Sequence, residues 1–163
     1  MLELTASALT PEAFAPFGEV IDARTSSAFP INAGRTQRHH DLAKVETLGE
    51  NARTLINIFV SQPVSLPLTL TFLERHPQGS QAFMPLHGER FIVVVAPPGE
   101  TIDPARVRAF VTDGRQGVNY AAGTWHAINS VLAREGEFLV VDRDGEGGNC
   151  DEYPLDILVT LDE

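Results

Sequence analysis

Positive charge and cysteine are both scarce in this chain of 163 residues. It has 12 Lys and Arg residues against 22 Asp and Glu residues, which gives a formal net charge of −10 at pH 7. Binding to nucleic acids or anionic membranes requires clustered Lys and Arg side chains, so we expect neither partner. The single cysteine, Cys150, has no second cysteine for an internal disulfide. This favours a reducing compartment, with the cytoplasm as the expected location.

Several common motifs are missing as well. No stretch approaches the roughly 20 apolar residues that span a bilayer, and the first residues show no basic region followed by an apolar one, so we expect a soluble protein without a secretory signal. The sequence has no glycine-rich phosphate loop, no Gly-x-Ser-x-Gly motif and no His-Glu-x-x-His pair. The usual signs of nucleotide binding, covalent catalysis and helical zinc sites are therefore absent, which favours small-molecule acid–base chemistry.

Short apolar runs separated by turn residues fill the sequence. The 13 Gly and 11 Pro are spread at short intervals, which leaves little room for long helices. We predict a single, mostly β domain over residues 1–163, a sandwich or barrel with a few short helices. One helix is expected to begin after Thr10 as N-cap, with Pro11 in its first turn, and to end by Gly18. A single helical turn is expected at 104–108. The expected strands are 54–60, 68–73, 81–86, 91–95, 107–112, 137–141 and 157–161.

Two of these runs, 54–60 and 91–95, are apolar nearly throughout. Such runs are typical of strands that are covered on both faces, as at the centre of a sandwich or in a subunit interface. A homodimer is therefore expected.

The densest group of polar side chains runs from Glu74 to Gln81, between two expected strands. Because side chains alternate along a strand, Glu74 and His76 point to the same side, whereas Arg75 points to the other side or swings away at the strand end. A carboxylate and an imidazole then share one wall. A second histidine, His126, follows a turn at 123–125.

This arrangement resembles a degenerate form of the two-part sequence signature of the cupin (RmlC-like) jelly roll. On that resemblance, the two histidine positions of the first part fall on Glu74 and His76, its glutamate falls on Gln81, and the histidine of the second part falls on His126. The Gly123-x-x-His126 spacing matches, whereas the proline expected before it is missing. The resemblance implies a jelly-roll β-barrel or sandwich.

Over nearly its whole length the chain is also similar to the ureidoglycolate lyase family of allantoin degradation, a part of purine metabolism. The resemblance implies cleavage of (S)-ureidoglycolate to glyoxylate and urea by a small, usually dimeric, cupin-like protein. The order and number of the matching segments carry the similarity, rather than any single one. They are 14–18, 31–34, 38–42, 62–68, 74–77, 81–83, 88–89, 116–120, 125–126, 142–143 and 149–151.

The residues suit this reaction chemically. Breaking the C–N bond of a carbinolamide requires a base for the hydroxyl proton and an acid for the departing urea nitrogen. We assign these roles to His76 and His126, with Glu74 either orienting His76 or acting as the base, and the sequence leaves open which residue is the acid. The substrate carboxylate favours a bidentate arginine, and Arg75 ranks first by proximity. Further candidates for substrate binding are Arg38, Arg143, His40, Gln81 and Asn119.

A bound metal ion is the main open question. The cupin ligand set of three imidazoles and one carboxylate is replaced here by Glu74, His76, Gln81 and His126, and a neutral amide is a poor ligand. We expect a site that works without tightly bound metal, although Glu74, His76 and His126 could hold Ni²⁺, Mn²⁺ or Zn²⁺ weakly. Two other functions stay open: a metal-dependent cupin enzyme of another class, and a non-catalytic cupin module that binds a small acid.

Structural roles compete with these assignments. His126 follows Trp125, and a histidine in that setting is often a packing residue. His40 fits either an orienting role at a pocket mouth or a solvated strand end, and Arg143 fits either a binding role or a turn of solvated charges. Cys150 is expected to be buried as a small packing residue.

Overall fold

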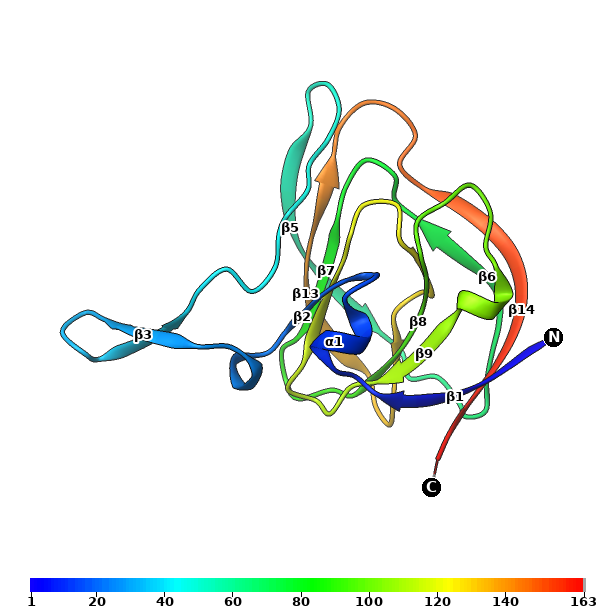
Figure 1. Cartoon of the computed structure of the whole chain (residues 1–163), viewed down its shortest axis with the longest axis horizontal. Helices are drawn as coiled ribbons and strands as arrows, with labels where there is room; N and C mark the ends of the chain where they lie inside the picture. The colour runs from blue at the N-terminus through cyan, green and yellow to red at the C-terminus, as the bar shows by residue number, and fades with distance from the viewer. Residues whose placement is uncertain (163) are drawn as a thin grey trace.

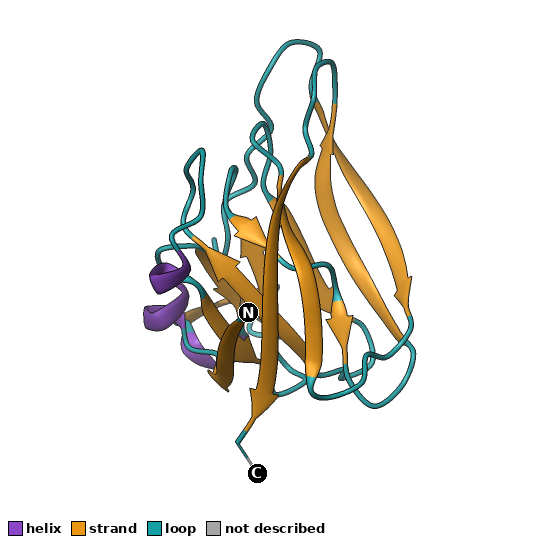
Figure 2. Cartoon of the chain, turned by 90° about the vertical axis from the view of Figure 1, so that its right-hand side faces the viewer, coloured by secondary structure: helices purple, strands orange, loops and turns teal. Residues whose placement is uncertain are grey.

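A computed structural model describes residues 1–162, and its regular secondary structure is mostly β-strand with only short helices (Figure 2). Two larger sheets make up the body, and the prediction of a mostly β barrel or sandwich is therefore confirmed. The seven-stranded sheet has the order β11 (Trp125–His126), β6 (Leu68–Arg75), β14 (Asp151–Leu161), β1 (Leu2–Ala8), β9 (Arg108–Val111), β8 (Phe91–Ala96) and β12 (Ser130–Val131). The five-stranded sheet has the order β2 (Gly18–Ile21), β10 (Gly117–Tyr120), β7 (Gln81–Pro85), β13 (Gly136–Asp144) and β5 (Arg53–Ser61).

The short strand β11 closes the larger sheet on itself. It pairs antiparallel with β6, where His126 lies opposite Glu74, and also with β8, where His126 lies opposite Val95. Most strand pairs are antiparallel, but β1 runs parallel to both β14 and β9. The closure at β11 brings Glu74 and His126 together although they are far apart in the sequence.

The position of strand β8 in the fold explains why its sequence is apolar throughout. Its alternate residues Phe91, Val93 and Val95 belong to one apolar cluster, which includes residues of both larger sheets, and the intervening residues belong to a second cluster within the larger sheet. All six residues of β8 are buried. The prediction that the 91–95 run is covered on both faces is therefore confirmed.

Strand β5 behaves differently, because it lies at the edge of the five-stranded sheet. Its residues Ile56, Ile58 and Val60 alternate along one face and are 74%, 53% and 56% exposed. The prediction that 54–60 is covered on both faces is thus wrong for the single chain. A row of exposed branched apolar side chains on a sheet edge is the kind of surface that protein contacts bury.

The short helix α1 (Pro11–Phe14) begins as the sequence predicts. The hydroxyl of Thr10 accepts a hydrogen bond from the backbone N–H of Ala13 at 3.2 Å, and Pro11 occupies the first turn. Phe14 is fully buried, with its ring centroid 6.1 Å from those of Phe110 and Tyr120. The second predicted turn is the 3₁₀ helix η2 (Pro104–Arg106). No helix within residues 1–162 is long and apolar enough to cross a membrane.

A hairpin formed by β3 (Ala28–Ile31) and β4 (Thr36–His39) projects from the body and was not predicted from the sequence (Figure 1). These two strands form a separate two-stranded sheet, and we refer to residues 28–39 as the arm. The arm is exposed along nearly its whole length.

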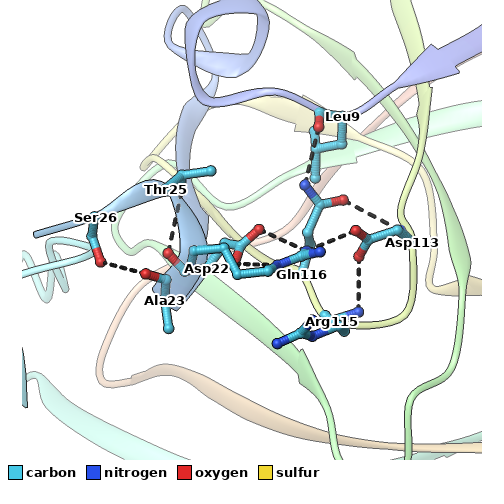
Figure 3. Close-up of polar contacts among 9 residues, drawn as sticks. Leu9, Asp22, Ala23, Thr25, Ser26, Asp113, Arg115 and Gln116 are labelled. Atoms are coloured by element: carbon cyan, nitrogen blue, oxygen red, sulfur yellow. Dashed lines mark hydrogen bonds and ion pairs between the residues drawn. The ribbon is translucent and has the colours of Figure 1, made fainter. Parts of the chain in front are cut away.

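The root of the arm is fixed to the body by a network of charged groups (Figure 3). Arg24, in the 3₁₀ helix η1 (Ala23–Thr25), donates to Asp22 at 2.9 Å and to Asp113 at 2.7 Å. Burial alone would raise the pKa of Asp22, but hydrogen bonds from the side chain and backbone of Arg24 outweigh it and hold the pKa below its ordinary value. The carboxylate of Asp22 therefore stabilises the folded state in its charged form.

Replacing this carboxylate should change how stability depends on pH. Because the folded-state pKa of Asp22 is lowered, its contribution is present above the unfolded pKa of about 4 and is lost as pH falls through the folded value. We expect Asp22→Asn to lower the melting temperature at pH 7 by about 2–4 °C, with the difference from wild type shrinking below pH 4. Thermal unfolding monitored by circular dichroism from pH 3 to 7 measures this, with exposed Glu12→Gln as control. A difference that is the same at pH 3 and pH 7 would contradict the assignment.

Candidate active site

Three side chains with acid–base capacity converge at the closure of the larger sheet. The Nε2 atom of His76 and the Nδ1 atom of His126 each lie 4.0 Å from Oε1 of Glu74. The two imidazole rings are 5.1 Å apart between centroids. Glu74 and His76 thus share one wall, as strand alternation predicts, and β11 brings His126 to the same wall.

The hydrogen bonds of the two histidines fix which ring nitrogen carries the proton. Nδ1 of His76 lies 2.7 Å from the carbonyl oxygen of Asn149, and Nδ1 of His126 lies 3.0 Å from that of Ala127. A carbonyl oxygen only accepts, so each Nδ1 is the donor and each Nε2 carries the lone pair of the neutral ring. Both Nε2 atoms are buried without a hydrogen-bond partner. The site therefore presents two unused imidazole acceptors.

A third unused acceptor comes from Gln81, at the start of β7. Its amide nitrogen donates to a carboxylate oxygen of Asp142 at 3.2 Å, and the other oxygen of Asp142 accepts from Asn57 at 2.9 Å. Because a carboxylate only accepts, this contact directs the amide nitrogen of Gln81 toward Asp142. The carbonyl oxygen of Gln81 is buried and has no partner.

Burial shifts the protonation of the groups at this site. Burial raises the pKa of Glu74, against the opposing effect of His76. Burial lowers the pKa of His126 to about 3, so its ring is neutral at pH 7. Tyr120 stacks on the His126 ring with centroids 4.2 Å apart and planes within 4°, and burial raises the pKa of its hydroxyl. The site thus combines a neutral imidazole with a carboxylate of increased basicity.

A cavity of about 310 Å³ opens beside His76. A larger cleft of about 730 Å³ lies at the root of the arm, but none of the three acid–base side chains lines it. We therefore take the smaller cavity as the candidate active site. It is lined by His76, Ser80, Gln81, Asp142, Arg143, Asn149 and Cys150.

Arg143 is the arginine of this cavity. Its Nε donates to the carbonyl oxygen of Leu48 at 2.6 Å, and its Nη2 donates to the side chain of Gln78 at 3.2 Å and to the carbonyl oxygen of Glu146 at 2.9 Å. The guanidinium thereby connects three loops, those that contain Leu48, Gln78 and Glu146. None of these bonds uses Nη1, which leaves that nitrogen for an anionic ligand.

Arg75 points away from the acid–base group. Its guanidinium donates to Asp151 at 2.8 Å and to the carbonyl oxygen of Gly99 at 2.6 Å, and it lies 4.7 Å above the ring of Trp125. Proximity in sequence ranked this residue first for substrate binding, but alternation along β6 places it on the other face of the strand from Glu74.

The other predicted binding residues lie outside the cavity of their own chain. Arg38 lies on the arm. His40 lines the larger cleft and packs edge-on against Phe29. Asn119 lies on the face of β10 opposite Tyr120, where its amide donates to Glu19.

Several residues at the site were not among those predicted to act there. Tyr120 is the strand neighbour of Asn119, and alternation would have placed it on the inner face. Asp142 orients Gln81, a contact between β13 and β7 that only the sheet register reveals. Cys150, expected to be buried, is exposed, and its Sγ lies 4.0 Å from Oε2 of Glu74. The prediction for Cys150 is therefore wrong.

The acid–base group also suits a divalent metal ion. One ligand atom each from Glu74, His76 and His126 lies within 4.8 Å of the others. Imidazole nitrogens and a carboxylate are ligands that Ni²⁺, Mn²⁺ and Zn²⁺ accept, and three ligands leave positions open. The residues present therefore fit such an ion, although no cofactor is established.

Known proteins resemble this chain over nearly its whole length. A sequence profile of the family described as ureidoglycolate lyase matches residues 1–162. The chain belongs to the ureidoglycolate lyase family. A protein named ureidoglycolate lyase from Chelativorans sp. (strain BNC1) is 54% identical over 153 residues, which cover 94% of this chain and 92% of the relative. A second from Stutzerimonas stutzeri is 53% identical, covering 94% and 90%. The predicted family resemblance is confirmed for this member of the ureidoglycolate lyase family.

Similarity to solved structures is weaker. A dTDP sugar isomerase from Desulfovibrio desulfuricans superposes with a TM-score of 0.47 at 15% identity, covering 85% of this chain and 86% of that one. The epimerase RmlC from Legionella pneumophila gives a TM-score of 0.45 at 16% identity, covering 83% and 71%. The site of this ureidoglycolate lyase family member is therefore interpreted from its own residues.

Proposed function

We propose that the chain is a ureidoglycolate lyase, which cleaves (S)-ureidoglycolate to glyoxylate and urea. The convergence of unused acceptors carries the proposal: the Nε2 atoms of His76 and His126 and the carbonyl oxygen of Gln81 are buried without partners. Such acceptors are costly unless a ligand supplies donors. Ureidoglycolate has a hydroxyl group and several ureido N–H groups, so it matches an acceptor-rich site.

Binding follows from two kinds of group, a cation and hydrogen-bond acceptors, that line the cavity or lie next to His76 at its wall. The free Nη1 of Arg143 supplies a charge-assisted hydrogen bond to the substrate carboxylate. His126 and Gln81 accept hydrogen bonds from the ureido group. These contacts orient the substrate with its hydroxyl group toward Glu74 and its bridging nitrogen toward His76.

The proton transfers then divide between Glu74 and His76. Glu74, whose raised pKa makes it a stronger base than an ordinary carboxylate, takes the hydroxyl proton as the carbonyl of glyoxylate forms. The C–N bond breaks with its electrons on nitrogen. Glu74 passes the proton it has taken to Nε2 of His76, which lies 4.0 Å away, and His76 donates this proton to the departing nitrogen of urea. His126 is held neutral, since its pKa is lowered to about 3, so it orients the ureido group and is not the acid.

A weakly held divalent ion is a further part of the proposal. Glu74, His76 and His126 would be its ligands, and when bound it would polarise a substrate oxygen as a Lewis acid. The roles of Arg143 and Gln81 in holding the substrate are the same with or without the ion.

We also propose that the protein is a homodimer in the cytoplasm. The exposed row of Ile56, Ile58 and Val60 supports a subunit contact, because monomeric proteins rarely leave such rows uncovered. The single cysteine supports a reducing compartment.

An assay of purified protein with (S)-ureidoglycolate tests the proposed reaction. We expect urea and glyoxylate in equal amounts, measured by coupled enzymatic detection of each product. The same assay after chelation, and after return of Ni²⁺, Mn²⁺ or Zn²⁺, shows whether the ion contributes. Retained activity after chelation indicates that the side chains suffice, and restored activity identifies a supporting ion. Release of ammonia and carbon dioxide, or a raised melting temperature without turnover, would contradict the lyase.

A further inference from the structure

The arm lacks a surface to pack against in its own chain. Within residues 1–162, β3 and β4 pair only with each other, and Phe29 on β3 is 45% exposed. An isolated two-stranded hairpin is at best marginally stable in water. A projecting hairpin with an exposed aromatic side chain therefore calls for a partner surface.

The arm is held in a defined direction. At its root, Arg24 bridges Asp22 and Asp113. The hydroxyl of Ser26 lies 2.8 Å from Nδ1 of His39. The arm points away from the body (Figure 1). Ala33 in the turn lies seven positions after Ser26, and at about 3.3 Å per residue the arm reaches roughly 23 Å. It can therefore extend onto a neighbouring molecule.

Charge distinguishes the arm from the rest of the chain. Residues 28–39 include Arg35 and Arg38 and no acidic residue, in a protein with a net charge of −10. The active-site cavity has the opposite balance. Asp142 lines it, Glu74 lies behind His76, and Arg143 already binds three groups of its own chain. An anionic substrate entering this cavity needs more positive charge than one chain provides there.

We propose that the arm of a second copy of this chain docks at the mouth of the cavity and brings Arg38 to the substrate carboxylate. The identity of the substrate rests on the proposed function. Arg38 lies opposite Phe29 in the hairpin register, so the aromatic ring packs beside the guanidinium at the contact. Arg38 and Nη1 of Arg143 then hold the carboxylate from two chains, and each site is incomplete without its partner.

Mixed dimers test this arrangement. Arg38→Ala is expected to raise KM at least about tenfold, because a charge-assisted hydrogen bond is lost, whereas Arg35→Ala, the matched loss of charge on the same arm, raises it less. Arg38→Ala and His126→Asn chains with different tags are co-expressed and purified as heterodimers. One of the two sites then has both an intact His126 and an intact partner arm, so kcat/KM should be about half that of wild type. The proposal would be overturned by a heterodimer kcat/KM no higher than half that of the Arg38→Ala homodimer. It would also be overturned if Arg38→Ala had the KM of wild type.

Docking is also measured without activity. Amide hydrogen exchange of residues 28–39 should be slow in the dimer, and light scattering should show a dimer at assay concentration. Exchange as fast as in an unstructured peptide, or a fully active monomer, would overturn the proposal. Glyoxylate binding followed by calorimetry should be at least about tenfold weaker in Arg38→Ala, and unchanged binding would refute the role of Arg38. If the arm is protected from exchange and glyoxylate binding depends on Arg38, but no urea is released, the lyase function is refuted. The proposed contact of the arm is then retained.

Discussion

Glu74→Gln is expected to lower kcat at least about a hundredfold, the usual share of general acid–base catalysis. The substitution keeps the size of the side chain and removes the carboxylate that lies 4.0 Å from both imidazoles. Without it, the hydroxyl proton has no strong acceptor as the carbonyl forms. Steady-state kinetics with (S)-ureidoglycolate measure the effect, and KM should change little because the carboxylate of the substrate binds elsewhere.

The control for Glu74 is its neighbour across the sheet. Glu152 lies opposite Glu74 in the register of β14 and β6, and it contributes to the raised pKa of Glu74. Because burial is the largest cause of the raised pKa of Glu74 and Glu152 itself is exposed, Glu152→Gln should keep kcat close to that of wild type. If Glu74→Gln and Glu152→Gln lower kcat equally, a general loss of negative charge would explain the effect and Glu74 would not be the base.

His126→Asn is expected to lower kcat by about a hundredfold as well, through loss of substrate alignment. The asparagine amide can still donate to the carbonyl oxygen of Ala127, which His126 contacts at 3.0 Å. It lacks the buried Nε2 acceptor for the ureido group. Because the ring of His126 stacks on Tyr120, some stability is lost too, so kcat is measured well below the melting temperature.

Exposed His87 provides the matched substitution. It pairs with Glu137 at 2.9 Å and does not line the active-site cavity. His87→Asn should leave kcat unchanged. Wild-type turnover in folded His126→Asn would remove His126 from the mechanism. If His126→Asn does not fold, kcat is measured for His126→Gln instead, which places an amide near the position of Nε2.

Local rules predicted part of the site well. Alternation along a strand is a short-range property, and it placed Glu74 and His76 on one wall and Arg75 on the other. The capping of α1 by Thr10 is likewise decided within one turn. The buried strand β8 was predicted because its apolar run reflects two covered faces.

The parts of the site that the sequence did not predict depend on contacts between residues that are far apart in the chain. Arg75 was ranked first because it is adjacent to Glu74, but Asp151 and Gly99, brought close by the fold, occupy its donors. The role of Asp142 depends on the register of β13 with β7. The run 54–60 has the composition of a covered strand although one face is open, because composition does not distinguish a core from a surface that a second subunit covers.

The two residues of β11 tie catalysis to global stability. Their backbone groups pair with both β6 and β8. We call this pairing, which closes the sheet, the seam, and it also holds His126 in place. Thermal or chemical opening of this seam separates the imidazole from Glu74 in the same event. Inactivation and cooperative melting should consequently share one midpoint, and stabilising the seam would extend the working temperature of the enzyme without any change in the groups that touch substrate.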